Sequence, residues 1–566
     1  MPGASNTALR PTGMGMNGML KDGHKQLSGL EEATYKNIEA AKQLSSCVRT
    51  SLGPNGMNKM VINHLEKLFI TNDSATIVKE LEVQHPAAKL LVMASKMQEA
   101  EVGDGTNLVV VLAGELLVLA EDLLKNGLHC SEIIAGYTSS LAKALEELDK
   151  CVCYSAPKSA LHDPIELAKA LKHVIAAKQY GNEDLFAAKI AEACVLAMPE
   201  NEANFNADNV RVAKIAEACV LAMPENEANF NADNVRVAKI VGNSVHATTV
   251  VQGMCLTRGV LGTITDAREA KIAVYGIPLD SAMTETKGTV LLKSAAELKA
   301  YSNSEEESLE AIIKAIADAG TKMIICGQAV GELALHFIEK YGMMVMKCPS
   351  KFELRRLCRT TGAAPLVRME PPTAADLGYC KHVFVKEIGS TQCTIFDHEK
   401  DNSKLATIVV RGSTSNIMDD VERAIDDGIN VVKSMTKNAR FVPGAGAIEL
   451  RLADALQQYG EAQPGLDQYA ITKFGLALEV VPRTLAENAG IDAAETIAAM
   501  YKAHKGGQGG VGIDINALKA GDCGVLDLLA TKKEALKLAA EAAITVLRVD
   551  SIIMSKPAGG PKPPEQ

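Results

Sequence analysis

Gly103-Asp104-Gly105-Thr106 is the stretch that decides the fold of this chain. It follows a helix-compatible segment, residues 86–101, and precedes an apolar helix expected over residues 107–124. A glycine-rich turn before a helix presents unpaired backbone N–H groups and the positive end of the helix dipole, and both suit phosphate. The aspartate adds a hard oxygen ligand, which suits Mg²⁺ bridging to phosphate. The turn therefore predicts a nucleotide hydrolase.

The common nucleotide-binding motifs do not account for this site. No G-x-x-x-x-G-K-[ST] string occurs in the chain, so it is not a Walker-type NTPase. Residues 507–512 match G-x-G-x-x-G, but they follow no expected strand and open no βαβ unit. A flexible loop is the favoured interpretation of that segment.

Length and composition indicate a multidomain globular protein. About two to four domains are expected for 566 residues, of which 47% are hydrophobic. The net charge of −10 argues against nucleic acid or an anionic membrane as a partner. The longest apolar segment, residues 108–124, contains three acidic residues and is too short to span a bilayer. Thirteen cysteines without a Cys-x-x-Cys pair, and no apolar N-terminal signal region, favour reduced thiols in the cytosol.

The outer thirds of the chain are typical of packed helices, and the middle third alternates between strands and helices. In the middle third, helices are expected between short apolar runs at residues 271–275, 323–326 and 343–346. This alternation predicts an α/β domain inserted into a mainly helical one. A β-hairpin is expected at residues 60–70, and long alanine-rich helices include one over residues 468–489.

A tandem duplication interrupts this pattern. Residues 189–213 recur without a single change as residues 214–238. Two identical copies do not predict a solenoid, which needs at least about three and usually diverged repeats. A recent duplication or an artefact in the sequence is the favoured interpretation. We expect one copy of each half to take its place in the fold and the surplus to bulge out as a loop or an extended helix.

Each of the other glycine- or aspartate-rich segments also has an interpretation without a ligand. Residues 52–59 suit a helix stop and a turn, residues 71–76 a helix N-cap, and residues 443–447 a plain turn. Asp426-Asp427 suits a solvated helix face. The conjunction is more informative, since several such turns at helix ends are expected where one anion site is built from separate segments. One carboxylate of the pair would then orient or deprotonate the water that attacks a γ-phosphate.

In order and spacing these segments resemble the motifs of a group II chaperonin, over the whole chain except the extra residues. The motifs are Leu52-Gly-Pro-Asn-Gly-Met-Asn-Lys59, Thr71-Asn-Asp73, Gly103-Asp-Gly-Thr106, the Glu422-Arg423…Asp427 helix and Pro443-Gly-Ala-Gly-Ala447. Other stretches resemble one subunit type of the eukaryotic cytosolic chaperonin, namely residues 59–68, 82–88, 548–550 and 556–564.

The resemblance implies the multidomain chaperonin fold. Its mainly α-helical equatorial domain would comprise residues 1–152 and 438–566, bind ATP and make most ring contacts. Its small α/β intermediate hinge would comprise residues 153–242 and 404–437, including the duplication. Its α/β apical domain, residues 243–403, would bind unfolded polypeptide and carry a helical protrusion near residues 282–304 as a built-in lid.

The implied function is that of an ATP-dependent molecular chaperone subunit. Two rings, each of eight paralogous subunits, would enclose cytosolic clients such as actin and tubulin, and hydrolysis of ATP to ADP with Mg²⁺ would close the lid. No nucleic-acid or membrane partner is implied. A ring subunit that binds clients but hydrolyses little ATP is the main alternative, and a small-molecule kinase is a distant one because no substrate-pocket motif occurs.

The resemblance also implies roles for individual residues. Asp104 resembles the Mg²⁺ ligand, Asp427 the catalytic carboxylate, and Asp73 the carboxylate near the γ-phosphate and its water. Lys178 resembles a lysine that reaches the phosphates, and Asp527 the acid that binds ribose. The other positions expected to line the nucleotide are Leu52, Gly53, Pro54, Gly103, Gly105, Thr106, Asn107, Leu108, Gly444, Ala445 and Gly446.

Two residues depart from the family pattern. Ala177 stands where a serine commonly precedes the lysine, and Ala445 replaces the middle glycine of the usual Gly-Gly-Gly. If residue 445 needs a positive φ, an alanine there costs on the order of 1 kcal/mol. Reduced nucleotide affinity or turnover is the expected consequence.

Overall fold

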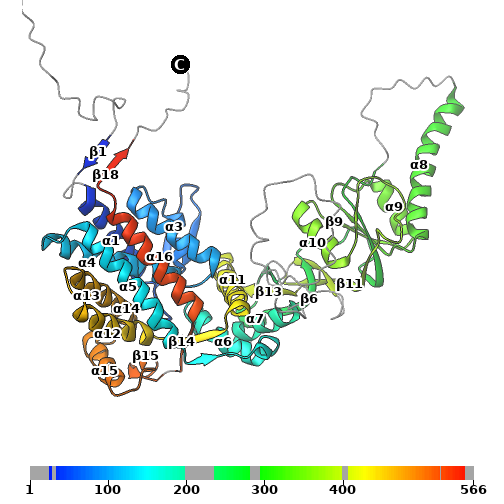
Figure 1. Ribbon diagram of the computed structural model, residues 1–566. Helices are drawn as coiled ribbons and strands as arrows, with labels where there is room; N and C mark the ends of the chain where they lie inside the picture. Colours follow the sequence, from blue (N-terminus) through cyan, green and yellow to red (C-terminus); the bar gives the residue numbers. More distant parts are fainter. Residues whose placement is uncertain are drawn as a thin grey trace, which may run out of the picture. The chain divides into compact units, whose positions relative to one another are not determined.

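The structure is a computed structural model that describes residues 25–28, 33–197, 235–280, 294–389, 391–397, 406–522 and 524–554. The chain divides into two compact units (Figure 1). Unit 1 comprises Met1–Glu101, Gly105–Cys153 and Phe441–Gln566, and unit 2 comprises Val102–Asp104 and Tyr154–Arg440. No helix in the described part of the chain combines the length and the apolar character needed to cross a membrane.

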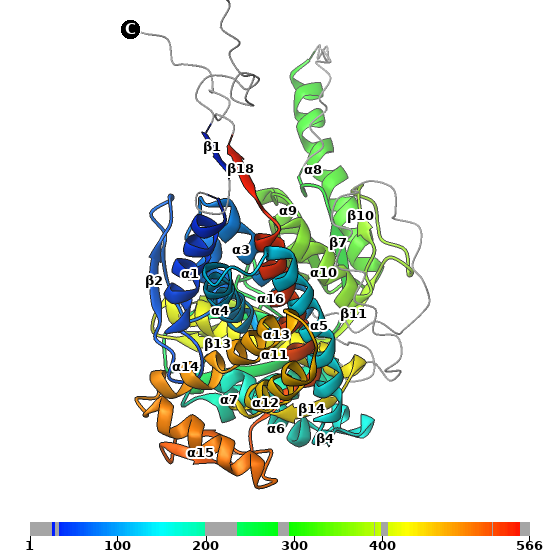
Figure 2. The same ribbon diagram turned by 60° about the vertical axis from the view of Figure 1, so that its left-hand side comes forward.

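Unit 1 consists mainly of helices around one central helix, α4 (Thr106–Lys125). The other helices are α1 (Tyr35–Arg49), α2 (Ser74–Glu80), α3 (Pro86–Glu101), α5 (Cys130–Lys150), α12 (Ala447–Ala462), α13 (Asp467–Leu478), α14 (Val480–Asn488), α15 (Ala493–Lys505) and α16 (Leu529–Leu547). Helix α4 packs against α1, α3, α13 and α16 (Figure 2). Its residues 108–114 are all buried, because a run of Leu, Val and Ala leaves no polar face.

Unit 1 also contains short strands, which pair in ladders of three or four residues. Strand β1 (Lys25–Ser28) pairs antiparallel with β18 (Ser551–Met554), which brings the first and last described segments side by side (Figure 1). The expected hairpin is confirmed as β2 (Lys59–Ile62) and β3 (Leu68–Thr71). The remaining antiparallel pairs are β14 (Arg440–Pro443) with β17 (Leu526–Leu528), and β15 (Gly512–Asp514) with β16 (Lys519–Gly521).

Unit 2 contains a nine-stranded sheet with the order β5-β13-β6-β12-β11-β7-β8-β9, in which β10 also pairs with β7. The strands are β5 (Val235–Val241), β6 (Thr249–Leu256), β7 (Asp266–Tyr275), β8 (Met323–Cys326), β9 (Met344–Lys347), β10 (Pro365–Leu366), β11 (Gly378–Ile388), β12 (Thr391–Asp397) and β13 (Ala406–Gly412). The three expected apolar runs form the parallel strands β7, β8 and β9. Strand β4 (Tyr154–Ser155) begins the long segment of this unit.

The helices of unit 2 are α6 (Pro164–Ala176), α7 (Glu183–Ala197), α8 (Ala295–Asp318), α9 (Glu332–Lys340), α10 (Lys351–Thr361) and α11 (Ser415–Lys437). Helices α8 and α9 connect the parallel strands β7, β8 and β9, as the alternating pattern predicts. Of the expected protrusion, residues 282–293 lie outside the described residues, and residues 295–304 form the first part of α8.

One expected helix is wrong. The sequence predicts a continuous helix over residues 468–489, but the structure has two helices, α13 and α14, which meet at Glu479. Pro482 lies in the first turn of α14. Because proline lacks a backbone N–H and clashes with the preceding turn, it is tolerated at a helix start and disfavoured in a helix interior. The break therefore places Pro482 where a proline is compatible with a helix.

The described parts of the duplication come from different copies. Residues 189–197 of the first copy form the end of α7, where Ile190 and Cys194 are fully buried. Residues 235–238 of the second copy begin β5, which pairs with β13 in parallel register. The rest of both copies lies outside the described residues. The first copy thus contributes the end of a helix, and the second copy contributes the start of a strand. The position of the surplus residues stays a prediction.

Deleting either copy of the duplication yields the same shortened chain, because the copies are identical. We expect that chain to fold as the full chain does, since it keeps the residues of both α7 and β5. Its unfolding free energy should be unchanged or higher by up to about 1 kcal/mol, as a roughly threefold shorter connection loses less closure entropy. Urea unfolding of both chains measures the difference, and a loss above about 2 kcal/mol would show that the surplus residues stabilise the fold.

Candidate nucleotide-binding site

The turn between α3 and α4 has a backbone that only glycine adopts easily. Gly103 has a φ of +86° and Gly105 a φ of +81°, both in the left-handed region. Gly105 is the N-cap residue of α4, so the N–H groups of the first turn of α4 begin at this turn. A Cβ atom on Gly105 would lie 3.0 Å from Thr531 Cγ2 and 3.1 Å from Gln98 Nε2. Glycine is therefore required at residue 105 for conformation and for packing.

Two polar residues of neighbouring helices lie behind this turn. Gln98 of α3 is fully buried, and its Nε2 donates a hydrogen bond to the Thr531 carbonyl oxygen of α16 at 3.4 Å. This hydrogen bond joins the first turn of α16 to the end of α3 next to Gly105. Sequence reasoning missed Gln98, because a single glutamine on a helix gives no local signal of a partner more than four hundred residues away.

Helix α14 lies between two other predicted segments of the site. Asn488 Nδ2 donates hydrogen bonds to the carbonyl oxygens of Leu52 at 2.9 Å and of Arg49 at 3.2 Å, which fixes the turn that contains Gly53. At the other end of α14, Pro482 packs against Gly446, the N-cap residue of α12. The turns at residues 52–56 and 443–447 are therefore supported by one helix.

Asp527 lies beside the turn at residues 443–447. It faces Val442 in the β14–β17 ladder, and Gly444, two residues after Val442, donates its N–H to the Val525 carbonyl oxygen at 2.8 Å. A Cβ atom on Gly444 would lie 3.0 Å from the carboxyl carbon of Asp527. The predicted ribose-binding acid and the predicted adenosine-side turn are thus adjacent in unit 1.

Ala445 has a positive φ, which is the condition under which alanine is strained at this position of the family pattern. Its φ is +54°, in the left-handed region where a Cβ atom is strained. Its carbonyl oxygen accepts a hydrogen bond from the Ile513 N–H at 3.0 Å. The turn therefore keeps its conformation with alanine at this position, and the strain is stored in the folded chain.

Replacing Ala445 with glycine is expected to change the unfolding free energy by less than about 0.5 kcal/mol. Relief of the strain, worth about 1 kcal/mol, is offset because glycine gains conformational freedom in the unfolded chain. Ala445→Val should instead lower the unfolding free energy by about 1–3 kcal/mol, since a β-branched residue at positive φ is strongly strained. Urea unfolding of both variants measures these values, and a neutral Ala445→Val would contradict the positive φ.

Asp73 is the N-cap residue of α2, as the interpretation without a ligand predicts. Its Oδ2 accepts hydrogen bonds from the Thr76 N–H at 3.0 Å and from the Thr76 hydroxyl at 2.7 Å. The residue is 6% exposed, and α2 packs against α3 and α4. The N-cap fixes the position of this carboxylate, and its role near a γ-phosphate stays a prediction.

The two aspartates on α11 have different environments in unit 2. Asp427 is 8% exposed and forms an ion pair with Lys178, which lies just after the end of α6. Asp426 is exposed. The solvated-face interpretation is therefore wrong for Asp427. Asp426 is exposed as a residue, although burial of its carboxyl group and the nearby Glu422 charge raise its pKa to about 6. The partner of Asp427 is a lysine that the family resemblance places at the phosphates.

Residues 102–104 also belong to unit 2, where they lie against α11. A Cβ atom on Gly103 would be 2.4 Å from Asn430 Cβ, so nothing larger than glycine fits there. Asn430 lies three residues after Asp427, a spacing that places both on one side of a helix. Gly103, Asp104, Lys178 and Asp427 thus belong to unit 2, and the other predicted residues belong to unit 1.

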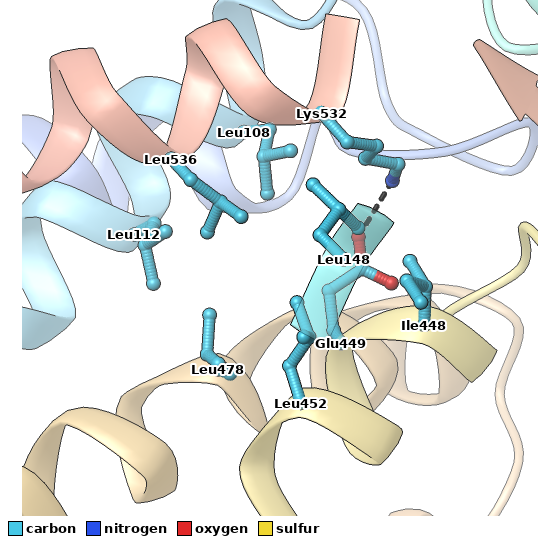
Figure 3. A pocket seen from close by; sticks show the side chains of 9 residues that line it. All are labelled: Leu108, Leu112, Leu148, Ile448, Glu449, Leu452, Leu478, Lys532 and Leu536. Carbon is cyan, nitrogen blue, oxygen red and sulfur yellow. Dashed lines mark hydrogen bonds and ion pairs between the residues drawn. The ribbon is translucent and has the colours of Figure 1, made fainter. Parts of the chain in front are cut away.

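Some of the residues predicted to line the nucleotide have side chains that are buried in the core. Thr106 and Leu108 are buried in the first turn of α4, and the Leu108 side chain points into an apolar cavity (Figure 3). Leu108 can therefore contribute only its backbone to a ligand. Pro54 is partly exposed in the turn that Asn488 supports.

The described residues suit Mg²⁺ that is held by a single carboxylate together with phosphate oxygens and waters. Among the described residues, no group of three or more His, Cys, Asp or Glu side chains could hold a metal ion. Mg²⁺ does not need such a cage, since it is commonly held by one or two carboxylates together with phosphate oxygens and waters. Asp104 in the turn is suited to be that carboxylate.

Comparison with known proteins identifies the class of protein. The model of the TCP-1/cpn60 chaperonin family matches residues 44–218 and 213–557. The chain therefore belongs to the TCP-1/cpn60 chaperonin family and is a chaperonin subunit. The two matches overlap at residues 213–218, across the junction between the two copies, as expected for a family sequence that carries 25 surplus residues.

Individual relatives narrow the similarity to one subunit type. The T-complex protein 1 subunit theta of Gallus gallus and that of Homo sapiens are each 50% identical to this chain, over 98% of it and 97% of their own length. The protein of the same name from Arabidopsis thaliana is 48% identical over 97% of this chain and 96% of its own length. The predicted resemblance to this family is confirmed, and the division into equatorial, intermediate and apical domains stays a prediction.

Proposed function

We propose that this chaperonin subunit binds ATP with Mg²⁺, hydrolyses ATP to ADP and phosphate, and uses the hydrolysis to drive the folding of bound polypeptides. The observation that carries the proposal is that the turns at residues 52–56 and 443–447 both contact α14, while Gly105 at the start of α4 contacts α16. A site built from several helix ends offers backbone N–H groups to phosphate without a Walker motif. Asp73, a second predicted carboxylate, is preorganised by its N-cap bonds.

In this proposal the residues have separate tasks. The N–H groups at the start of α4 bind phosphate, Asp527 binds ribose, and Asp104 is the protein ligand of Mg²⁺. Mg²⁺, when bound, supplies neutralisation of the phosphate charge. Asp427 orients or deprotonates the attacking water, and the Lys178 ammonium stabilises the negative charge of Asp427. Such a site needs positioning and charge more than covalent chemistry.

We further propose that the subunit acts in a hetero-oligomeric double ring of paralogous chaperonin subunits in the cytoplasm. The relatives bear the name of a subunit of a T-complex protein, which supports a multi-subunit assembly. Unfolded polypeptides of the actin and tubulin class would be its clients, bound by residues 243–403. Closure of a lid near residues 282–304 would follow hydrolysis.

The test is nucleotide binding and hydrolysis by the purified full-length protein, alone and assembled with its partner subunits. We expect ATP binding that depends on Mg²⁺, measured by calorimetry, and slow release of phosphate. Absence of ATP binding in both preparations would overturn the proposal. Binding without hydrolysis would instead support a second candidate, a ring subunit that hydrolyses little ATP, which the strained Ala445 favours.

A further inference from the structure

A lysine at the start of α16 joins two acidic residues from separate elements. Lys532 Nζ lies 2.6 Å from Glu449 Oε1 on α12 and 2.9 Å from Asp527 Oδ2 on β17. The side chain of Glu449 is 3% exposed and that of Lys532 is 14% exposed. A dashed line in Figure 3 marks the contact between them. Burial by itself lowers the pKa of a lysine, but the charges and hydrogen bonds of Asp527 and Glu449 raise the pKa of Lys532 above its ordinary value. Lys532 is therefore charged at neutral pH.

The surroundings of this group are apolar. Leucine and isoleucine side chains line a cavity beside it, among them Leu108, Leu452 and Leu536 (Figure 3). Glu449 Oε2 is buried there without a hydrogen-bond partner. Because the removal of charges from water is expensive, well-packed apolar residues in their place often stabilise a fold equally well or better. Stability alone is thus a poor explanation for three charges at this position.

The position of the group relative to the proposed site offers a better explanation. Glu449 is in the first turn of α12, directly after the turn at residues 443–447. Asp527 lies against Gly444 of that turn. The residue before Lys532 is Thr531, which packs against Gly105 on the phosphate side. The first turn of α16 therefore contacts both the proposed adenosine side and the proposed phosphate side of the site.

We propose that Lys532 is a positioning residue for nucleotide recognition, which orients the Asp527 carboxylate toward the ribose hydroxyl groups. This inference rests on the proposed function, in which Asp527 binds ribose. Without the ammonium, the 29% exposed Asp527 side chain can turn toward solvent. The ribose contact is then lost, while the phosphate contacts made by the start of α4 remain.

The test compares the binding of ATP, 2′-deoxy-ATP and 3′-deoxy-ATP by the full-length protein, by calorimetry. The wild-type protein should bind ATP more tightly than at least one deoxy analogue, by about 10-fold, the usual effect of one hydrogen bond to a charged group. Lys532→Met should bind ATP about 10-fold more weakly and should no longer distinguish it from that analogue. Its affinity for the deoxy analogue should be nearly unchanged.

A double variant separates positioning from stability. Lys532→Met leaves Glu449 buried without a partner and is expected to be less stable. Lys532→Met/Glu449→Leu replaces the ion pair by apolar residues and should regain a wild-type melting temperature. If Lys532 positions Asp527, this folded double variant still binds ATP and the deoxy analogue equally. A double variant that recovers the wild-type preference for ATP would overturn the inference.

Lys533 supplies the matched control. It is the next residue of α16 and pairs with Asp149 at 2.6 Å on the surface, away from Asp527. Lys533→Met should keep the wild-type preference for ATP, and loss of the preference in this variant as well would also overturn a specific role of Lys532. A wild-type protein that binds no ATP would overturn the proposed function itself, which is a different result from equal binding by Lys532→Met alone.

Discussion

Replacing Asp427 with alanine is expected to slow ATP hydrolysis by about 10²–10⁴-fold, the usual contribution of a positioned general base. ATP affinity should change little, because the role proposed for Asp427 is on the attacking water and not on the bound nucleotide. Single-turnover phosphate release and equilibrium ATP binding, measured on the same preparation of assembled rings, separate the two effects. Lid closure, followed by protection from protease, should fall together with hydrolysis.

The Asp427 variant needs two companions. Asp427→Ala leaves the Lys178 ammonium, 13% exposed, without its ion-pair partner, and so part of any loss could reflect instability. Asp427→Asn keeps a hydrogen-bond acceptor for Lys178 and should be nearly as slow. Asp426→Asn removes the neighbouring carboxylate on the same helix and should hydrolyse ATP at the wild-type rate. Equal hydrolysis by Asp427→Asn and the wild-type protein would contradict the assignment.

Local sequence patterns are sufficient for the segment at the centre of the site. The sequence predicts helices over residues 86–101 and 107–124, and the structure has α3 at Pro86–Glu101 and α4 at Thr106–Lys125. The glycines between them predict a tight turn, and both have positive φ. These features depend on residues a few positions apart, which is why sequence patterns capture them.

The supporting contacts depend on residues far apart in the sequence. Asn488 contacts the Leu52 carbonyl oxygen, and Lys532 contacts Glu449, across separations of 436 and 83 residues. On a helix, each of these polar residues has the pattern of an ordinary surface position until its partner is known. The same reason explains why the pattern could not separate Asp427 from Asp426, since their burial depends on α6 and Lys178.

The family resemblance pointed to one backbone angle that the structure tests, the φ of residue 445. It marks residue 445 as a position of the usual Gly-Gly-Gly turn, and Ala445 has a positive φ, the backbone conformation that favours glycine. It does not place the surplus copy of the duplication, because the family sequence has no equivalent residues. The two family matches that meet at residues 213–218 mark the same discontinuity.

Replacing Asp104 with alanine is expected to remove the dependence of ATP binding on Mg²⁺. In Mg²⁺ the wild-type protein should bind ATP much more tightly than in EDTA, since Asp104 together with phosphate oxygens would hold the metal. Asp104→Ala should lose at least about 10–100-fold of that affinity, because even outer-shell partners of a metal contribute this much. Calorimetric titration with ATP, in Mg²⁺ and in EDTA, measures both proteins.

Asp104→Ala keeps the backbone of the turn. Gly103 and Gly105, whose φ values are positive, determine its conformation, and Asp104 is partly exposed between them. Glu101→Ala, at the exposed end of α3 three residues earlier, removes the same charge without touching the turn and should keep the Mg²⁺ dependence. An Asp104→Ala protein that still binds ATP more tightly in Mg²⁺ than in EDTA, by the wild-type factor, would assign the metal to other ligands. Loss of the dependence in Asp104→Ala alone would place Mg²⁺ at the turn. Gly103 of this turn packs against Asn430 on α11, one helical turn from Asp427.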